Sequence, residues 1–244
     1  MLITARTWSS RPSSLRAGER STTSERLRLK LELVAPALAL PGRILLEHSR
    51  ARELFPRYLA TGYHVVRAAV PLMETALDRA RDLAAQDVVA DRLAAYLERH
   101  ILEERHGDEP GGAFVDDLQA LGVDVAALRT ELPPPKVAAL IGAQYYWIFH
   151  HHPVALLGFL ELEAYHTQAP TVERLIERTG LPRAGFRQLL LHAKLDVAHA
   201  RELHRVLDSL PLERWHEQLI ATSALQTISL VADALLDVVQ DGVA

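Results

Sequence analysis

Helical periodicity runs through nearly the whole chain after residue 25, and it limits the possible folds more than any other feature. Apolar residues recur at intervals of three and four, and no segment alternates with a period of two over a useful length. The dominant residues are Leu, Ala, Arg and Glu, which are strong helix formers. We therefore expect an all-α fold.

Proline and glycine divide this pattern into separate helices. The breaks include Pro41-Gly42, Pro110 to Gly112, Pro133 to Pro135, Pro153, Pro170 and Gly180. The helices predicted between them lie near 24–39, 43–59, 61–85, 87–107, 113–121, 136–150, 154–166, 171–179, 184–208 and 212–239. Thr171 is the expected N-cap of the eighth, and Gly180 is expected to end it.

Residues 1–25 have a different composition from the rest. They are rich in Ser, Thr and Arg, and the first acidic residue is Glu19. This composition is typical of a disordered tail and also of a targeting peptide, but the apolar core of a secretory signal is missing. We interpret residues 1–25 as a flexible tail of a cytoplasmic protein and residues 26–244 as one compact helical domain.

The composition also excludes several classes of site and partner. The chain has no cysteine, so any metal must be held by nitrogen and oxygen ligands. A formal net charge of −4, without a cluster of basic and aromatic residues, gives no reason to expect nucleic acid as a partner. No uncharged apolar run reaches the ~20 residues of a membrane span, so we expect no membrane partner.

The strongest candidate for a chemical site is the stretch that contains His192, Asp196 and His199. Spacings of four and three residues place the three side chains within an arc of roughly 60° on one helical face. Two imidazoles and a carboxylate arranged in this way can hold iron, manganese or zinc. One helix supplies only half of a dinuclear site, so facing helices must supply the other ligands.

Two other segments could supply them. Near the end of the helix predicted at 87–107, Glu103 and His106 share a face, and we favour this pair over Glu104 or His100. In the apolar helix predicted at 154–166, Glu161 and Glu163 are two residues apart, so at most one of them faces the interior. A carboxylate in such a setting is costly unless it is paired, protonated or bound to metal.

The remaining histidines have simpler interpretations. Residues 150–152 are three histidines before Pro153, where a helix should end, and cations suit a helix C-terminus. We interpret them as capping or surface residues. His204 and His216 lie off the proposed ligand face, and we interpret them as structural.

Together these segments resemble the haem-oxygenase-like di-iron oxidases and oxygenases, a group often labelled iron-containing redox enzymes. The resemblance covers about residues 60–240, and the stretches that carry it are HILEERHGDEPGGAFVDDLQALGV, AQYYWIFHHHPVALLGFLELEAY and HAKLDVAHARELHRVLDSLPL. The last contains the His-x3-Asp-x2-His pattern of that family. The chain departs from the family around His106, where many relatives place a histidine directly before an acidic residue and an aromatic.

The resemblance implies a single-domain haem-oxygenase-like bundle that binds two ferrous ions per chain and uses O2 as co-substrate. The implied ligands are Glu103, His106, Glu163, His192, Asp196 and His199. Family members oxidise or oxygenate small organic molecules such as fatty acids, amino acids or amines, and bundles of this class often form homodimers. The alternatives are a metal-free enzyme of the same fold (thiamin-salvage or quinone-cofactor oxidase type), a ferritin-like iron-binding protein and a helical interaction protein.

Overall fold

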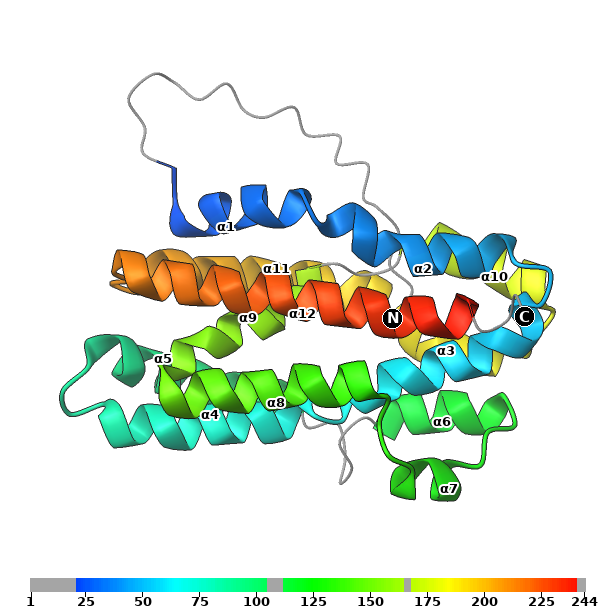
Figure 1. The fold of residues 1–244 in the computed structure, drawn as a ribbon, viewed down its shortest axis with the longest axis horizontal. Helices are drawn as coiled ribbons and strands as arrows, with labels where there is room; N and C mark the ends of the chain where they lie inside the picture. Colours follow the sequence, from blue (N-terminus) through cyan, green and yellow to red (C-terminus); the bar gives the residue numbers. More distant parts are fainter. Residues whose placement is uncertain (1–20, 105–111, 165–167, 241–244) are drawn as a thin grey trace.

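The structure is a computed structural model that describes residues 21–104, 112–164 and 168–240. Within these ranges only the backbone is described at 112–113, 163–164 and 194–198. Over the described residues the chain forms α-helices and short 3-10 helices, without a β-strand, which confirms the expected all-α fold (Figure 1).

The α-helices are α1 (Thr23–Glu32), α2 (Ala35–Glu47), α3 (Ala51–Val66), α4 (Ala69–Leu83), α5 (Val88–Glu104), α6 (Gly112–Ala120), α7 (Val125–Thr130), α8 (Pro135–His150), α9 (Leu156–Leu160), α10 (Ala169–Thr179), α11 (Arg187–Ser209) and α12 (Arg214–Gln240). The 3-10 helices are η1 (Pro153–Ala155), η2 (Glu161–Ala164) and η3 (Arg183–Phe186).

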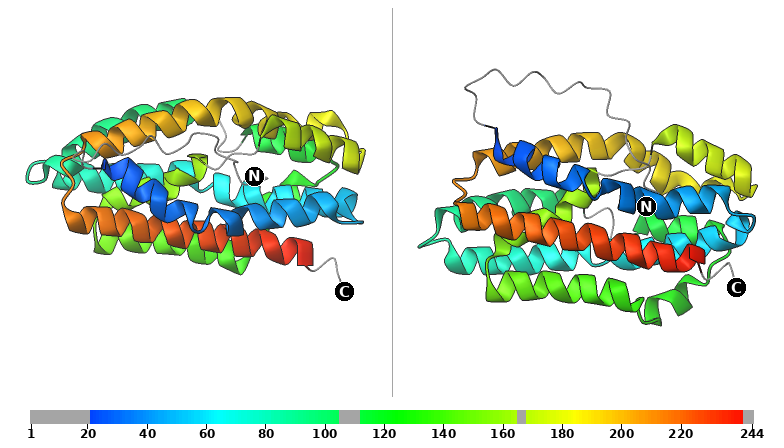
Figure 2. Two further views of the ribbon diagram at one scale, coloured as in Figure 1. Left: turned by 90° about the horizontal axis from the view of Figure 1, so that it is seen from above. Right: turned by 45° about the horizontal axis from the view of Figure 1, so that its top comes forward.

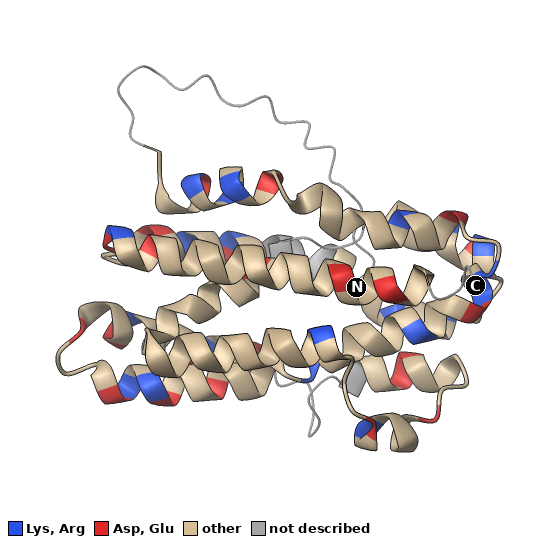
Figure 3. Ribbon diagram, viewed as in Figure 1, with Lys and Arg blue, Asp and Glu red and all other residues tan. Residues whose placement is uncertain are grey.

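The long helix α12 organises the bundle. It packs against α2, α3, α8 and α9, while α4 and α5 form an antiparallel pair beside α8 (Figures 1 and 2). Between Gln218 and Ala232 α12 carries no charged residue, and Figure 3 shows the charges gathered instead on the outer helices and the helix ends. By length and composition α12 could cross a membrane, but 61% of its most apolar 18-residue stretch is buried in the bundle. That burial is typical of a core helix in a helical domain.

Local sequence signals explain several helix ends. A capping box starts α1: the Thr22 hydroxyl accepts a hydrogen bond from the Glu25 N–H, and the Glu25 carboxylate accepts one from the Thr22 N–H. Gly180 ends α10 in the left-handed region at φ 59°, as predicted. The other end of α10 differs from the prediction, because the helix begins at Ala169 and the N-cap is Gln168 rather than Thr171. Proline at the second helical position favours this earlier start.

The largest difference from the predicted helices is at Pro41-Gly42. Instead of separating two helices, these residues lie buried inside α2, and the chain breaks after α1 and again near residues 48–50. The missing N–H of a helical proline costs about 3 kcal/mol. Burial of Leu38 and Leu45 against the core offsets this cost, because both side chains are fully inaccessible. A further helix, α7, was not predicted, and α1 begins at Thr23, inside the stretch interpreted as a tail.

Candidate metal centre

The last turn of α5 lies against α11, and this contact gathers histidine and carboxylate side chains. The buried ring of His100 in α5 lies edge-on to the ring of His199 in α11, with 5.9 Å between the ring centroids. Oε1 of Glu104, also in α5, lies 3.7 Å from Nδ1 of His199. Two helices that are far apart in the sequence therefore present imidazole and carboxylate groups to each other.

The two adjacent glutamates of α5 point in different directions. The side chain of Glu104 is 24% exposed and reaches His199, whereas that of Glu103 is 50% exposed and has Oε2 3.7 Å from Nδ1 of His100. Consecutive helical residues point ~100° apart. Because α5 is oriented with Glu104 toward α11, Glu103 points toward the edge of the contact between the two helices. Sequence reasoning favoured Glu103 and kept Glu104 and His100 as alternatives. The structure places those two alternatives beside His199 and places Glu103 beside His100.

On α11 the backbone agrees with the helical spacing assumed from the sequence. The helix runs without interruption from Arg187 to Ser209, so residues 192, 196 and 199 share one side of it. His192 and His199 are partly buried. Asp196 lies between them on α11, but its side chain is outside the described part of the structure, as is all of His106.

The apolar helix expected at 154–166 is divided into η1, α9 and η2, and η2 packs against α11. In η2 the carboxylate of Glu161 is buried, with Oε1 3.5 Å from Nε2 of His204. The neighbouring Glu161 carboxylate raises the pKa of His204, and burial opposes it. His204 is five residues beyond His199, which is ~140° around the helix. Glu161 therefore contacts a different side of α11 from the side that carries His199. The side chain of Glu163 lies outside the described residues.

A sequence profile of the family described as iron-containing redox enzymes matches residues 57–232, which is most of the chain. The chain belongs to this family. No curated protein matches it significantly.

Several solved structures share its fold, including the following two. One is a domain of unknown function with a heme oxygenase-like fold from Shewanella denitrificans OS217, with a TM-score of 0.73, 16% identity and coverage of 92% of this chain and 94% of that one. The other is a TenA homolog from Pseudomonas syringae pv. tomato strain DC3000, with a TM-score of 0.61, 15% identity and coverage of 93% and 96%. The fold of this iron-containing redox enzyme family member is thus the haem-oxygenase-like bundle that the sequence predicted.

The residues at the contact between α5 and α11 fit iron. Imidazole nitrogen and carboxylate oxygen suit ferrous iron, and the chain has no cysteine to compete as a ligand. The 3.7 Å between Glu104 Oε1 and His199 Nδ1 is too long for a hydrogen bond. It leaves room for an ion that makes bonds of ~2 Å to both atoms.

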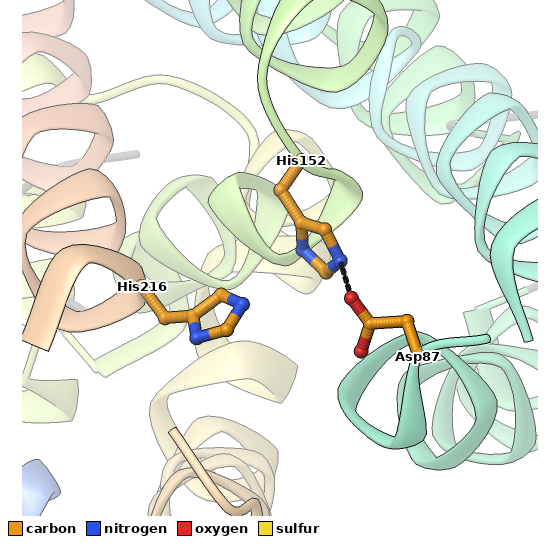
Figure 4. A group of neighbouring side chains, drawn as sticks. All are labelled: Asp87, His152 and His216. Atoms are coloured by element: carbon orange, nitrogen blue, oxygen red, sulfur yellow. Dashed lines mark ion pairs between the residues drawn. The ribbon is translucent and has the colours of Figure 1, made fainter. Parts of the chain in front are cut away.

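A second cluster lies at the opposite end of α5, which is ~25 Å long. Asp87 precedes α5, His152 precedes η1, and His216 lies in the first turn of α12 (Figure 4). Oδ2 of Asp87 is 3.2 Å from Nε2 of His152, and one potential ligand atom from each of the three residues lies within 4.8 Å of the others. Sequence reasoning did not single out Asp87. Its position at the start of the helix predicted at 87–107 was the only signal available.

The hydrogen bonds of the two rings in this cluster argue against a metal. Nδ1 of His152 accepts from the N–H of Val154, and Nδ1 of His216 accepts from the N–H of Glu213, both at 3.1 Å. A backbone N–H can only donate, so each neutral ring carries its proton on Nε2. A histidine bound to metal through Nε2 has the opposite pattern, with Nδ1 donating.

The same bonds explain the cluster as a set of helix caps. Oδ1 of Asp87 accepts from the N–H groups of Val89 and Ala90 at the start of α5, at 2.7 and 3.1 Å. Burial acts to raise the pKa of Asp87, but these two hydrogen bonds together with the nearby His152 and His216 outweigh it, and the pKa is lowered. Burial lowers the pKa of both His152 and His216. The interpretation of His216 as structural agrees with its contacts. His152 was interpreted as a capping or surface residue at the end of a helix, but it is buried and caps the start of η1 instead.

Proposed function

We propose that this protein binds two ferrous ions and uses O2 to oxidise or oxygenate a small organic molecule. Membership of the iron-containing redox enzyme family supports the iron and the redox chemistry. The single observation that carries the proposal is the position of His199 in α11 beside His100 and Glu104 in α5. This contact joins the histidine-rich helix to a second source of ligands, which a dinuclear centre requires.

The proposed ligands come from α11, η2, α5 and the segment that follows α5 in the sequence. They are His192, Asp196 and His199 of α11, Glu163 of η2, His106, and Glu103 or its neighbour Glu104 of α5. The pairing of Glu161 with His204 supports Glu163 as the ligand from η2, because the two glutamates are too close in sequence to serve one side of α11 together.

Bound ferrous iron would supply the electrons that reduce O2. The chain itself would hold the ligands in place and exclude water. Leu156, Leu157 and Phe159 of α9 are buried, and α9 is continuous with η2, so apolar residues stand directly before the proposed Glu163 ligand. Such surroundings suit a small, largely apolar substrate.

A metal-free enzyme of the same fold is the second candidate, because a TenA homolog shares the architecture. Salvage enzymes of that type rely on a cysteine, and this chain has none. A ferritin-like site would need Glu-x-x-His elements that project inward from two helices of one bundle. The sequence repeats this spacing at Glu163/His166 and Glu213/His216. However, Nδ1 of His216 already accepts from the N–H of Glu213, and the fold is that of a haem-oxygenase-like protein.

The decisive experiment is an anaerobic ferrous titration of the apo-protein, followed by rapid mixing with O2 and stopped-flow absorbance. We expect about two irons per chain and a transient visible band. Replacing His192 with Ala should weaken iron binding at least tenfold, on the order of the loss that follows even from disturbing a residue behind a ligand. His150→Ala removes an exposed histidine at the end of α8 and serves as the matched control.

The same titration discriminates between the candidate glutamates. Glu104→Gln and Glu103→Gln change adjacent side chains of α5, and the one whose loss weakens iron binding is the ligand. If wild type takes up no iron, or if His192→Ala and His199→Ala take up iron as wild type does, the iron proposal is refuted. The metal-free candidate is then favoured.

A further inference from the structure

Asp117 in α6 is a fully buried carboxylate that holds the start of α11. Its Oδ2 accepts a hydrogen bond from the N–H of Gln188 at 2.8 Å, and its side chain is only 1% exposed. Nε of Arg187 lies 3.6 Å from Oδ1. Burial raises the pKa of Asp117 to about 6, even though the bond from Gln188 and the charge of Arg187 act to lower it.

This cap comes from a distant part of the chain, although a local one would suffice for stability. Phe186 stands at the N-cap position of α11 and provides no side-chain hydrogen bond. Ser, Thr, Asn or Asp at that position would cap the helix without burying a charge. Burying a carboxylate is costly, so the arrangement is a poor way to gain stability alone. It does, however, fix α11 relative to α6.

The packing around Asp117 leaves little freedom for α11 to slide. A Cβ atom at Gly185, in η3, would lie 2.4 Å from Cγ of Leu121, so any larger residue would require the Leu121 side chain at the end of α6 to move. Phe186 is fully buried and stacks on Phe55 of α3, with ring centroids 4.4 Å apart and planes within 5°. The start of α11 is therefore held from two sides.

This contact lies close to the proposed ligands of α11. Gln188 is four residues before His192, which is one turn and ~6 Å along the same side of α11. We infer that Asp117 is a positioning residue of the iron site, which sets the axial position of His192 relative to the ligands supplied by α5. This inference rests on the proposed function.

The test is an anaerobic ferrous titration of the full chain, with near-infrared circular dichroism to report the geometry of bound ferrous ions. Asp117→Ala should weaken the binding of at least one iron by about 10- to 100-fold, as other residues that orient metal ligands do, and change the spectrum. Asp117→Asn keeps an oxygen that can accept from Gln188 and should restore both. The matched control is Asp124→Ala, which removes the N-cap of α7, where Asp124 accepts from the Ala127 N–H at 3.1 Å.

The outcomes separate this inference from the proposed function. Suppose that Asp117→Ala binds iron with the affinity and spectrum of wild type while its melting temperature falls as in Asp124→Ala. In that case Asp117 is only a helix cap, and the inference is overturned. If Asp117→Ala does not fold, Asp117→Glu keeps the charge but lengthens the side chain by one methylene. Unchanged iron binding in that variant would also overturn it. Failure of the unaltered chain to take up iron would instead refute the proposed function itself.

Discussion

At the scale of single residues, Asp117 makes stability depend on pH in a direction opposite to that of most carboxylates. Its pKa is raised from 3.8 to about 6, so the folded protein favours the protonated form. The stability that this preference contributes is complete below pH 3.8 and is lost as the pH rises through about 6. Asp117→Asn removes the titration. The free energy of unfolding of the variant, relative to wild type, should therefore rise by up to about 3 kcal/mol between pH 4 and pH 7.

Urea unfolding of both proteins across that range measures the difference directly. Asp124→Asn changes an N-cap on α7 in the same way and provides the control for a general effect of the substitution. A constant difference between wild type and Asp117→Asn at all pH values would contradict the raised pKa of Asp117.

At the scale of elements, one glycine determines how closely α9 approaches α12. A Cβ atom at Gly158 would lie 2.4 Å from the carbonyl oxygen of Ile220 and 2.7 Å from the backbone nitrogen of Ala224. Backbone atoms cannot move aside as a flexible side chain can, so Gly158→Ala should destabilise the protein by about 3 kcal/mol or more. Because η2 continues directly from α9, iron binding by the folded fraction should weaken as well.

Gly142 in α8 provides a matched control for this substitution. It also lies in a helix, but within the described structure nothing stands within 4 Å of its Cβ position. Gly142→Ala should therefore stabilise the protein by about 0.5 to 1 kcal/mol. Thermal melts of the two variants and of wild type test both the predicted loss and the predicted gain of stability. Equal melting temperatures for all three proteins would contradict the argument.

The elements also show how far the sequence determines the fold and the site. Helical spacing predicted that residues 192, 196 and 199 share one side of a helix, because that relation depends only on the backbone of α11. The choice between Glu103 and Glu104 depends on the rotation of α5 against α11, which is set by packing across the bundle. The direction of Glu161 depends on the change from α9 to the 3-10 helix η2, and a uniform helical period cannot anticipate such a change.

Tertiary packing also explains why the proline and glycine signals gave the wrong bounds for the first helices. Pro41 and Gly42 carry local signals to end a helix, but core burial along α2 outweighs them. In contrast, Gly180 ended α10 as predicted, because its left-handed conformation is a local property of the residue.

At the scale of the whole molecule, α5 separates two clusters that contain histidine and carboxylate but differ in their hydrogen bonds. At its C-terminal end, the cluster at His199 combines potential ligands. At its N-terminal end, Asp87, His152 and His216 cap the starts of α5, η1 and α12, where Nδ1 of each ring already accepts a backbone hydrogen bond. Protonation of either ring would require a proton on that same Nδ1 and would break its cap. The caps therefore predict a bundle end that weakens in acid and does not bind metal.

His216→Asn tests both parts of this statement, because the amide oxygen of Asn can take the place of Nδ1 as the acceptor for Glu213. Burial lowers the pKa of His216 in the folded state, so the stability that it contributes is complete above about pH 6.5 and is lost as the pH falls through the lower, folded-state pKa. The variant should thus lose less of its free energy of unfolding than wild type between pH 7 and pH 4.5, measured by urea unfolding, while its iron stoichiometry stays unchanged.

His150→Asn, an exposed site, should follow wild type in both measurements. If His216→Asn instead bound one metal ion fewer per chain, the cluster in Figure 4 would be a ligand site, and the argument from its hydrogen bonds would be wrong.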